Sequence, residues 1–453
     1  MKRSLFATAL IGAASFAYLV DDAHASGFAI REQSSSALGN AFAGQSAAAQ
    51  DISYSFFNPA TLALHDRRQA LVSLSYIIPQ SDPKDDVSAS TANFPPSFTI
   101  GGGKGKDIGE NALVPAVYAM VPIGERLRAG ISTNAPFGLS TDNTNDWAGR
   151  YHAIDSELIT VNINPMLAGR VNDWLYVGGG LQIQYARARL TNAIDFGTIG
   201  AGAGVPFAVP TTQDGKVKLK ADDWGVGGTL GVIVEPREGT RFGVGWRSQI
   251  DHTLDGDANF TEDAAGVAVA LQGATGAFVD TDIKADLTTP ERIGVGAYHE
   301  LTGELAVVGE FEWTNWSRFD ELRIEFDNRA QPDSVTDESW DDTLFFAGGF
   351  IYRPRRLEGF TFRIGGAYDQ TPVPDAERRT PRLPDADRYW LAVGATYEPS
   401  AQVKVDFGYT HIFMDDGRIR QKASGEGNTF RGNLNVEYEN QVDIVALQAR
   451  IAF

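Results

Sequence analysis

The stretch AQVKVDFGYTHIF, residues 401–413, alternates apolar and polar side chains at every second position. Val403 and Val405 fall on one face of an extended chain, and Lys404 and Asp406 fall on the other. Because successive side chains of a β-strand point to opposite faces, this pattern predicts a strand with one apolar face. A soluble sandwich would bury that face in a core, whereas a membrane barrel would turn it to lipid.

The same alternation recurs along the chain and predicts about fourteen strands, an even number of the kind bacterial outer-membrane barrels have. We place them near residues 69–79, 112–122, 127–135, 157–170, 174–190, 221–235, 241–255, 281–300, 304–326, 342–352, 360–370, 387–398, 401–413 and 437–453. Tight turns between them alternate with long segments, and this asymmetry is typical of such barrels. The sequence therefore predicts an all-β fold, a transmembrane antiparallel β-barrel over residues 69–453.

The start of the chain has the pattern of a secretory signal peptide over residues 1–25. Lys2 and Arg3 give the positive start, an apolar core follows, and Ala23-His24-Ala25 is a small-x-small cleavage site. A signal peptide and a barrel together predict the outer membrane of a Gram-negative bacterium.

The net charge of -19 argues against a nucleic-acid partner, because phosphate contacts supply most of that affinity. The acidic residues gather in the long loops, as at Asp341 and Asp342. They either form a solvated surface or bind divalent ions that bridge to lipopolysaccharide, since hard cations prefer oxygen ligands.

The chain ends on a predicted strand whose last residue is Phe453, which is similar to a recognition signal of the barrel assembly machinery. We expect a monomer in contact with outer-membrane lipid and lipopolysaccharide. Aromatic residues such as Trp313 and Trp316 are expected near the membrane boundary, which amphipathic rings favour.

Residues 26–68 interrupt the strand series and are rich in small side chains. Their place between the signal peptide and the first strand predicts an N-terminal hatch that plugs the lumen. Within it, Asn58 can hydrogen-bond nearby backbone and Pro59 fixes φ, so Asn58-Pro59-Ala60 predicts a defined turn that holds the plug in shape.

Several blocks together resemble the FadL-type transporters of long-chain fatty acids and hydrocarbons. They are SGFAIREQSSSALGNAFAG from Ser26, NPA at 58–60, VNINPMLAGRV from Val161, QIQYARARL from Gln182, PERIGVGAY from Pro290, EWTNWSRFDELR from Glu312 and TPVPDAERRTPRLPDADRYWLAVG from Thr371. The resemblance covers nearly the whole mature chain. It implies capture of an apolar ligand between the third and fourth external loops. The ligand then passes to an internal site that Ser26, Gly27 and Phe28 contact, and it leaves sideways at a kink in the third strand.

The third and fourth long loops, residues 191–220 and 256–280, carry many apolar side chains for segments expected in water. Exposed apolar surface usually marks a binding site. The predicted groove residues are Phe196, Val205, Phe207, Val209, Val267, Val269, Leu271 and Phe278. The alternative is that the loops pack against each other over the barrel, and both can hold together.

The third predicted strand ends at Asn134, Pro136 and Gly138. Proline cannot donate to a β-ladder and glycine often marks a bend. These residues either end the strand or, as the resemblance implies, form the kink for lateral exit.

A carboxylate ligand in an apolar lumen should meet a cation, because an unpaired buried charge is very costly. Arg187 and Arg189 are the predicted partners. Other basic positions that the resemblance implies are replaced, near Asn192 and in the acidic run Asp337–Asp342. An uncharged hydrocarbon or aromatic substrate therefore stays open.

Nothing in the sequence indicates an enzyme. The six histidines show no metal-ligand spacing and no nucleophile elbow, so we expect no metal and no cofactor. The favoured function is passive, ligand-gated uptake of long-chain fatty acids or related hydrophobic compounds. The alternatives are a channel for neutral hydrocarbons and, from another class, a surface adhesin or structural barrel.

Overall fold

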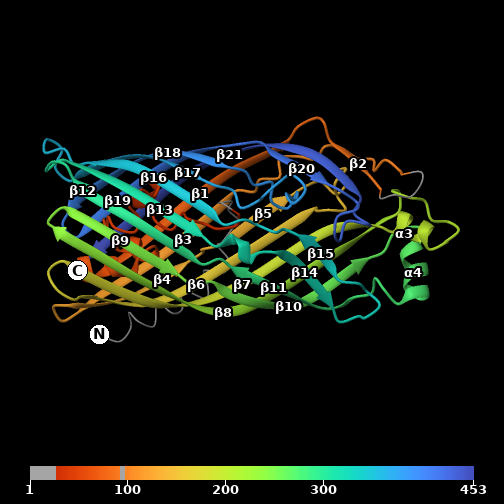
Figure 1. The fold of residues 1–453 in the computed structure, drawn as a ribbon, viewed down its shortest axis with the longest axis horizontal. Helices are drawn as coiled ribbons and strands as arrows, with labels where there is room; N and C mark the ends of the chain where they lie inside the picture. Colours follow the sequence, from red (N-terminus) through yellow and green to blue (C-terminus); the bar gives the residue numbers. More distant parts are fainter. Residues whose placement is uncertain (1–26, 92–96) are drawn as a thin grey trace.

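The computed structural model describes residues 27–91 and 97–453, so the predicted signal peptide and Ser26 lie outside the described residues. Most of the described chain forms one antiparallel sheet that closes on itself, because β1 pairs with both β21 and β3 (Figure 1). The strands are β1 (Gln69–Pro83), β2 (Ser88–Ser90), β3 (Ala112–Ile123), β4 (Leu127–Asn134), β5 (Gly138–Asp142), β6 (Asp155–Arg170), β7 (Leu175–Asp195), β8 (Asp214–Arg237), β9 (Thr240–Arg247), β10 (Ile250–Thr261), β11 (Thr281–Thr289), β12 (Arg292–Glu300), β13 (Leu305–Thr314), β14 (Glu321–Phe326), β15 (Ser334–Asp337), β16 (Thr343–Tyr352), β17 (Phe360–Asp369), β18 (Arg388–Ser400), β19 (Val403–Met414), β20 (Gly417–Gln421) and β21 (Asn433–Ala452). The helices are α2 (Ser35–Leu38), α3 (Phe196–Gly202) and α4 (Val267–Thr275), with 3₁₀ turns η1 (Ile52–Phe56), η2 (Pro59–Leu64) and η3 (Trp316–Arg318).

Several barrel strands consist of two consecutive segments. β4 and β5 both pair with β6, so together they form the third strand, broken between them. In the same way β1 continues as β2, β9 as β10, β11 as β12, β13 as β14, β15 as β16 and β19 as β20. Counted this way the barrel has 14 strands, and the predicted fold is confirmed.

Several strands run farther toward the long-loop end than the sequence pattern predicts. β7 ends at Asp195 and β8 begins at Asp214, where we expected a loop over residues 191–220. In this region Lys218 and Lys220 face outward while Val217 and Leu219 are buried inside. The alternation is inverted because the outer face here meets water and the inner face is apolar.

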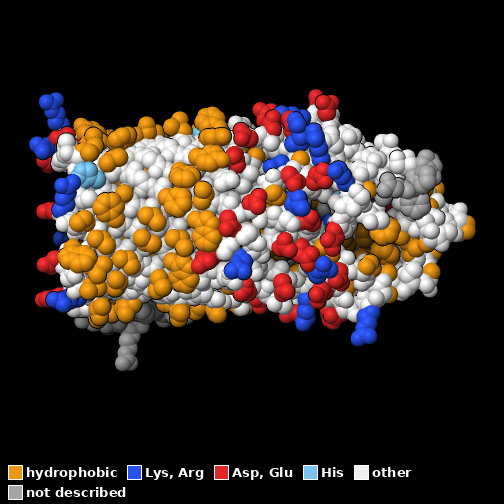
Figure 2. Space-filling view, viewed as in Figure 1, with side chains coloured by type: hydrophobic (Ala, Val, Ile, Leu, Met, Phe, Trp, Pro, Cys, Tyr) orange, Lys and Arg blue, Asp and Glu red, His pale blue; other side chains and the backbone are white. Residues whose placement is uncertain are grey.

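The band of the barrel nearer the short turns has the opposite pattern. Hydrophobic side chains cover its outer face in Figure 2, and Val226 and Leu230 are 76% and 58% exposed. Charged side chains cluster beyond this band, toward the long loops. An apolar outer band of this kind is what a membrane-spanning barrel turns to lipid. None of the helices in the described part of the chain is long and apolar enough to cross a membrane.

Residues 27–64, which we call the inner segment, lie inside the barrel and are almost entirely buried (Figure 1). Wall glycines allow their close approach. A Cβ on Gly243 would lie 1.9 Å from the Ser46 carbonyl oxygen, and one on Gly365 would lie 2.2 Å from the Asn40 carbonyl oxygen. These positions exclude side chains because the inner segment's backbone occupies that space.

Side-chain caps shape the inner segment locally. The Ser34 hydroxyl accepts from the Ala37 N–H at 3.2 Å before α2, and the Asp51 carboxylate accepts from the Ser53 N–H before η1. Asn58 caps η2 by accepting from the Ala60 N–H at 2.9 Å, with Pro59 in the first position. Short polar side chains are favoured at helix starts because they satisfy free N–H groups.

Candidate functional site

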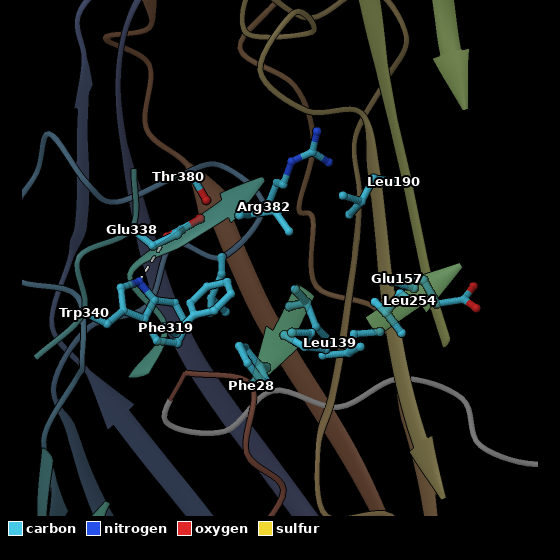
Figure 3. Close-up of a pocket in the computed structure, with 15 residues that line it drawn as sticks. Phe28, Leu139, Glu157, Leu190, Leu254, Phe319, Glu338, Trp340, Thr380 and Arg382 are labelled. Carbon is cyan, nitrogen blue, oxygen red and sulfur yellow. Dashed lines mark hydrogen bonds between the residues drawn. The ribbon is translucent and has the colours of Figure 1, made fainter. Parts of the chain in front are cut away.

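An apolar cavity lies inside the barrel beside the start of the inner segment (Figure 3). It holds about 630 Å³ of empty space, which includes space open to solvent. Its lining residues are Phe28, Leu139, Glu157, Leu158, Ala188, Leu190, Leu254, Leu287, Phe319, Leu322, Glu338, Trp340, Thr380, Arg382 and Leu383. A mostly apolar cavity with a few polar groups is the usual form of a small-molecule site. We call it the internal cavity.

Phe28 is held in an aromatic cluster at one side of the internal cavity. Its ring centroid lies 4.7 Å from that of Trp316, 5.5 Å from Phe319, 5.6 Å from Trp340 and 6.0 Å from Phe137. Trp316 is therefore buried inside the barrel, and the prediction that it lies at the membrane boundary is wrong. Edge-to-face ring pairs of this kind add stabilisation beyond area burial.

The preceding residue, Gly27, is packed just as closely. It has φ of +57°, and a Cβ there would lie 2.8 Å from the rings of both Trp316 and Trp340. Its N–H donates to the Asp385 carboxylate at 3.0 Å. Only glycine fits this position without strain, so the backbone passes close to the rings of Trp316 and Trp340 just before Phe28.

The polar groups of the internal cavity come from two long loops. Glu338 accepts from the Trp340 indole N–H at 3.0 Å, and burial raises the pKa of its carboxyl to about 8. Arg382 donates to the Ser156 hydroxyl at 2.9 Å, and burial together with nearby Arg431 lowers the pKa of its guanidinium to about 9. Figure 3 shows Arg382 on the opposite side of the cavity from Phe28.

The predicted kink coincides with the break between β4 and β5, which we call the third-strand break. Asn134 ends β4, Pro136 lies in the gap and Gly138 begins β5. The inner segment fills the gap: the Ile30 N–H donates to the Pro136 carbonyl at 2.8 Å, and the Gly138 N–H donates to the Phe28 carbonyl at 2.9 Å. Residues 28–30 thus stand where a strand would otherwise continue.

Arg187 and Arg189 do not face the internal cavity, so this part of the sequence prediction is wrong. On β7 the side chains of Ala188 and Leu190 line the cavity, and the odd-numbered neighbours point outward. Arg187 pairs with Glu157 at 2.6 Å, and Arg189 pairs with Asp155 at 3.1 Å. Figure 3 shows the Glu157 carboxylate pointing away from Phe28 and Leu139. The physical reason is that the outer face of β7 meets water at this height.

The eight predicted groove residues are not brought together in one groove. Three of them, Phe196, Val267 and Leu271, are at most 1% exposed and form the contact between α3 and α4. Val205 and Phe278 are partly buried against that contact, whereas Phe207, Val209 and Val269 are about half exposed. The loops therefore pack against each other, as the alternative interpretation expects.

A second cavity does lie beneath these packed loops, and Phe278 lines it. It holds about 790 Å³ of empty space, which includes space open to solvent. Its apolar lining includes Ile194, Ile199, Val217, Phe260, Phe326 and Phe430. We call it the outer cavity. One cluster of buried side chains from β7, β8, β10, β11 and β14 extends to both cavities.

Sequence reasoning missed Trp340, Glu338 and Arg382. The first two lie in a loop that we interpreted only as acidic. Arg382 lies in the block at residues 371–394, which resembles FadL-type transporters, but the sequence alone indicated no role for it. The Pro-rich composition of that block, TPVPDAERRTPRLPDAD, could have indicated a fixed loop turned into the barrel. Within the described ranges, no group of three or more His, Asp or Glu side chains could hold a metal ion.

Comparison with known proteins identifies the family to which this chain belongs. Residues 16–453 match the model of the family described as outer membrane protein transport protein (OMPP1/FadL/TodX). The chain is 29% identical to the long-chain fatty acid transport protein of Escherichia coli O6:H1, over 94% of each chain. It is 30% identical to the 47 kDa outer membrane protein of Pasteurella multocida, over 96% of this chain and 100% of that one.

Solved structures show the same fold. A FadL homologue from Pseudomonas aeruginosa has a TM-score of 0.85 at 24% identity, with 94% of this chain and 100% of that chain covered. The toluene transporter TbuX of Ralstonia pickettii has a TM-score of 0.64 at 18% identity, with 93% and 99% covered. The chain is an outer-membrane β-barrel and belongs to the OMPP1/FadL/TodX family of outer membrane transport proteins.

Proposed function

We propose that the protein takes up long-chain fatty acids or related hydrophobic compounds across the outer membrane without an energy source or a covalent step. The observation that carries this proposal is the apolar cluster that joins the outer cavity to the internal cavity. Leu190, Leu254 and Leu322 line the internal cavity, while Val217 and Phe326 line the outer one. A hydrophobic molecule can move along such a lining without contacting water.

We propose that the inner segment is a hatch and that residues 28–30 are its moving part. The body of the segment is tied to the wall by polar contacts: Ser46 donates to Glu310 at 2.5 Å, and Gln45 donates to Glu312 at 2.9 Å. Residues 28–30 make two backbone hydrogen bonds to the third-strand break, and the Phe28 side chain makes ring contacts within an apolar cluster. A ligand can replace ring contacts more readily than it can break charge-assisted hydrogen bonds.

In this mechanism the ligand enters the internal cavity and displaces Phe28 from its aromatic cluster. Withdrawal of residues 28–30 then opens the third-strand break, and the ligand leaves into the membrane between β4 and β5. Arg382 is the proposed partner of a fatty-acid carboxylate, because it donates hydrogen bonds to the neutral side chains of Ser156 and Asn192. Names of relatives support a hydrophobic ligand, since one is a long-chain fatty acid transport protein and another structure is of a toluene transporter.

A neutral aromatic hydrocarbon is the second candidate ligand. The four rings around Phe28 form a site that already holds one aromatic group. Among the described residues that line the internal cavity, Arg382 is the single basic side chain, and it lies across from the rings. A ligand without a carboxylate could thus use the aromatic side of the cavity alone.

The test is uptake of labelled oleate and of toluene by cells that lack their own transporter and express the protein. Ala188→Phe places a ring in the internal cavity, in space that the ligand needs, and should slow uptake by about 5- to 150-fold, because overpacking costs ~1–3 kcal/mol. Ile183→Phe, on the outward face of the same strand, is the matched control. Equal uptake by cells with and without the protein would refute the proposal, and faster uptake of one ligand decides between the candidates.

We further propose that the protein acts as a monomer surrounded by outer-membrane lipid and lipopolysaccharide. Its insertion would use the barrel assembly machinery, with Phe453 as part of the signal. Phe453 follows β21, is 76% exposed and donates its N–H to the Arg68 carbonyl.

A further inference from the structure

Seven arginines in the described part of the chain are at most 6% exposed, and five of them form ion pairs with carboxylates. The pairs are Arg31–Glu312, Arg128–Asp66, Arg150–Asp214, Arg363–Asp406 and Arg388–Asp385. Arg247 and Arg292, which we call the arginine pair, have no ion pair among the described residues. An unpaired buried charge is strongly unfavourable, so this exception requires an explanation.

The two arginines are also placed directly opposite each other. Arg247 ends β9 and Arg292 begins β12, and they are partners in the ladder between these strands. Like charges at opposed positions of a sheet repel each other. Arg247 donates to the Gln182 amide oxygen and to the Phe56 carbonyl at 2.8 Å. The Nη2 atom of Arg292 is buried without a hydrogen-bond partner.

The arginine pair adjoins the inner side of the third-strand break. The Arg292 guanidinium carbon lies 5.4 Å from the ring centroid of Phe137, which stands in the break. The Arg247 guanidinium carbon lies 4.2 Å from the ring centroid of Phe56 in the inner segment. Phe137 also contacts Phe28, with ring centroids 6.0 Å apart, and Phe28 lines the internal cavity.

Unpartnered amides occur on the wall at the same level. The side-chain nitrogen and oxygen of both Asn162 and Asn164 are buried without hydrogen-bond partners. Asn162 is the ladder partner of Asn134 at the end of β4 and of Gln184 on β7. Gln182, two residues from Gln184, is the side chain that contacts Arg247. Cations and amide donors therefore surround one side of the break.

We propose that the arginine pair, with the amides of Asn162 and Asn164, is a second anion site that takes the ligand's carboxylate during exit. The inference rests on the proposed function and adds a second binding site, which the ligand reaches after the internal cavity. The alkyl chain of a fatty acid can enter the membrane through the break, but its carboxylate cannot enter hydrocarbon at low cost. Arg247 and Arg292 hold that carboxylate until the chain has left. Glu312 lies near Arg292 but forms no ion pair with it, and its two carboxylate oxygens accept from Arg31 and Gln45 instead.

The test compares uptake of oleate with uptake of oleyl alcohol, a neutral molecule of the same chain length. Arg292→Met should slow oleate uptake about tenfold and leave oleyl alcohol uptake and the equilibrium affinity of the purified protein for oleate unchanged. Gln182→Glu is a second, isosteric variant that places a carboxylate on Arg247, and it should give the same selective loss. Arg241→Met is the matched control. Arg241 lies on β9, the strand that carries Arg247, but near the short turns, where it contacts Tyr298.

The outcomes separate this site from the proposed function. Two results in correctly assembled Arg292→Met and Gln182→Glu proteins would overturn the anion site. One is that oleate and oleyl alcohol uptake fall by the same factor, and the other is that neither uptake falls. An equal loss in Arg241→Met would also overturn it, because the effect would not depend on position. If the unaltered protein takes up neither ligand, the proposed function fails and this site fails with it.

Discussion

Replacing Gly243 by alanine should displace the inner segment from the wall while the barrel still assembles. The new Cβ would lie 1.9 Å from the Ser46 carbonyl oxygen and 2.7 Å from its carbonyl carbon. Both atoms belong to backbone, so no side-chain rotation can relieve the contact. Overpacking of this kind costs ~1–3 kcal/mol.

Further loss comes from the hydrogen bonds that Ser46 makes next to this contact. Its N–H and hydroxyl donate to the Glu310 carboxylate at 3.1 and 2.5 Å. Hydrogen bonds to charged groups contribute about 1.5–3 kcal/mol each, so breaking one raises the total to ~3–6 kcal/mol. The ratio of displaced to seated inner segments should then rise at least about a hundredfold, since 1.4 kcal/mol is a factor of ten.

The assay is sensitivity of whole cells to erythromycin and vancomycin, which an intact outer membrane excludes. Cells with Gly243→Ala should become more sensitive, while the heat-modifiable band of the folded barrel stays present. Gly348→Ala is the matched control, because a Cβ there meets nothing within 4 Å. Unchanged sensitivity of Gly243→Ala cells with a fully assembled barrel would refute the reasoning that the inner segment closes the lumen at this contact.

Three further predictions follow from single features. Burial raises the pKa of Glu338 to about 8, so the stability that its neutral form contributes is fully present below the ordinary pKa of 4.5 and is lost as the pH rises through 8. The charged neighbours of Glu338 are Arg382, Arg431 and Asp337. Oleate affinity should fall between about pH 7 and 9, and Glu338→Gln should remove that fall in equilibrium binding. Deletion of Phe453 should reduce the heat-modifiable band, and an undiminished band would contradict its role in assembly. Deletion of residues 58–60 removes the Asn58 cap, which contributes about 1 kcal/mol, so it should loosen the hatch and alter uptake and antibiotic sensitivity; unchanged values of both would contradict the hatch assignment.

The sequence predicts the barrel well because lipid imposes a simple rule on the membrane band. At residues 401–413 apolar side chains must face outward, so period-two alternation reveals the strand and which of its faces meets lipid. The long-loop end follows no such rule. There Val217 and Leu219 face an apolar interior and Lys218 faces water, so part of β8 has the composition of a loop while it forms a strand.

The same inversion explains the error over Arg187 and Arg189. In the membrane band a charged side chain on a strand must face the lumen, and we extended that rule to a height where the outer face is solvated. The true polar groups of the internal cavity, Glu338 and Arg382, come from loops that fold back into the barrel. Local periodicity carries no information about such folding, because it depends on contacts between residues far apart in the chain.

The third-strand break illustrates a partial success. Pro136 and Gly138 mark an irregularity in the sequence, and the strand is indeed broken there. What fills the break is set by distant residues, since Phe28 and Ile30 supply the missing backbone partners. No pattern local to residues 134–138 could indicate this pairing.

The central claim is that residues 28–30 must leave the third-strand break for transport to occur. Ala29 and Phe137 are opposed in an antiparallel bridge, at a position that the two neighbouring hydrogen bonds flank. Such pairs have Cα atoms about 4.5 Å apart, within the range that a disulfide spans. The chain has no native cysteine, so Ala29→Cys with Phe137→Cys would introduce one defined cross-link.

The decisive measurement is oleate uptake by cells carrying this double variant, before and after oxidation and again after reduction. The account predicts that oxidation abolishes uptake, that a reductant restores it, and that neither single variant responds to oxidation. A fully cross-linked protein that takes up oleate as fast as its reduced form would contradict the claim.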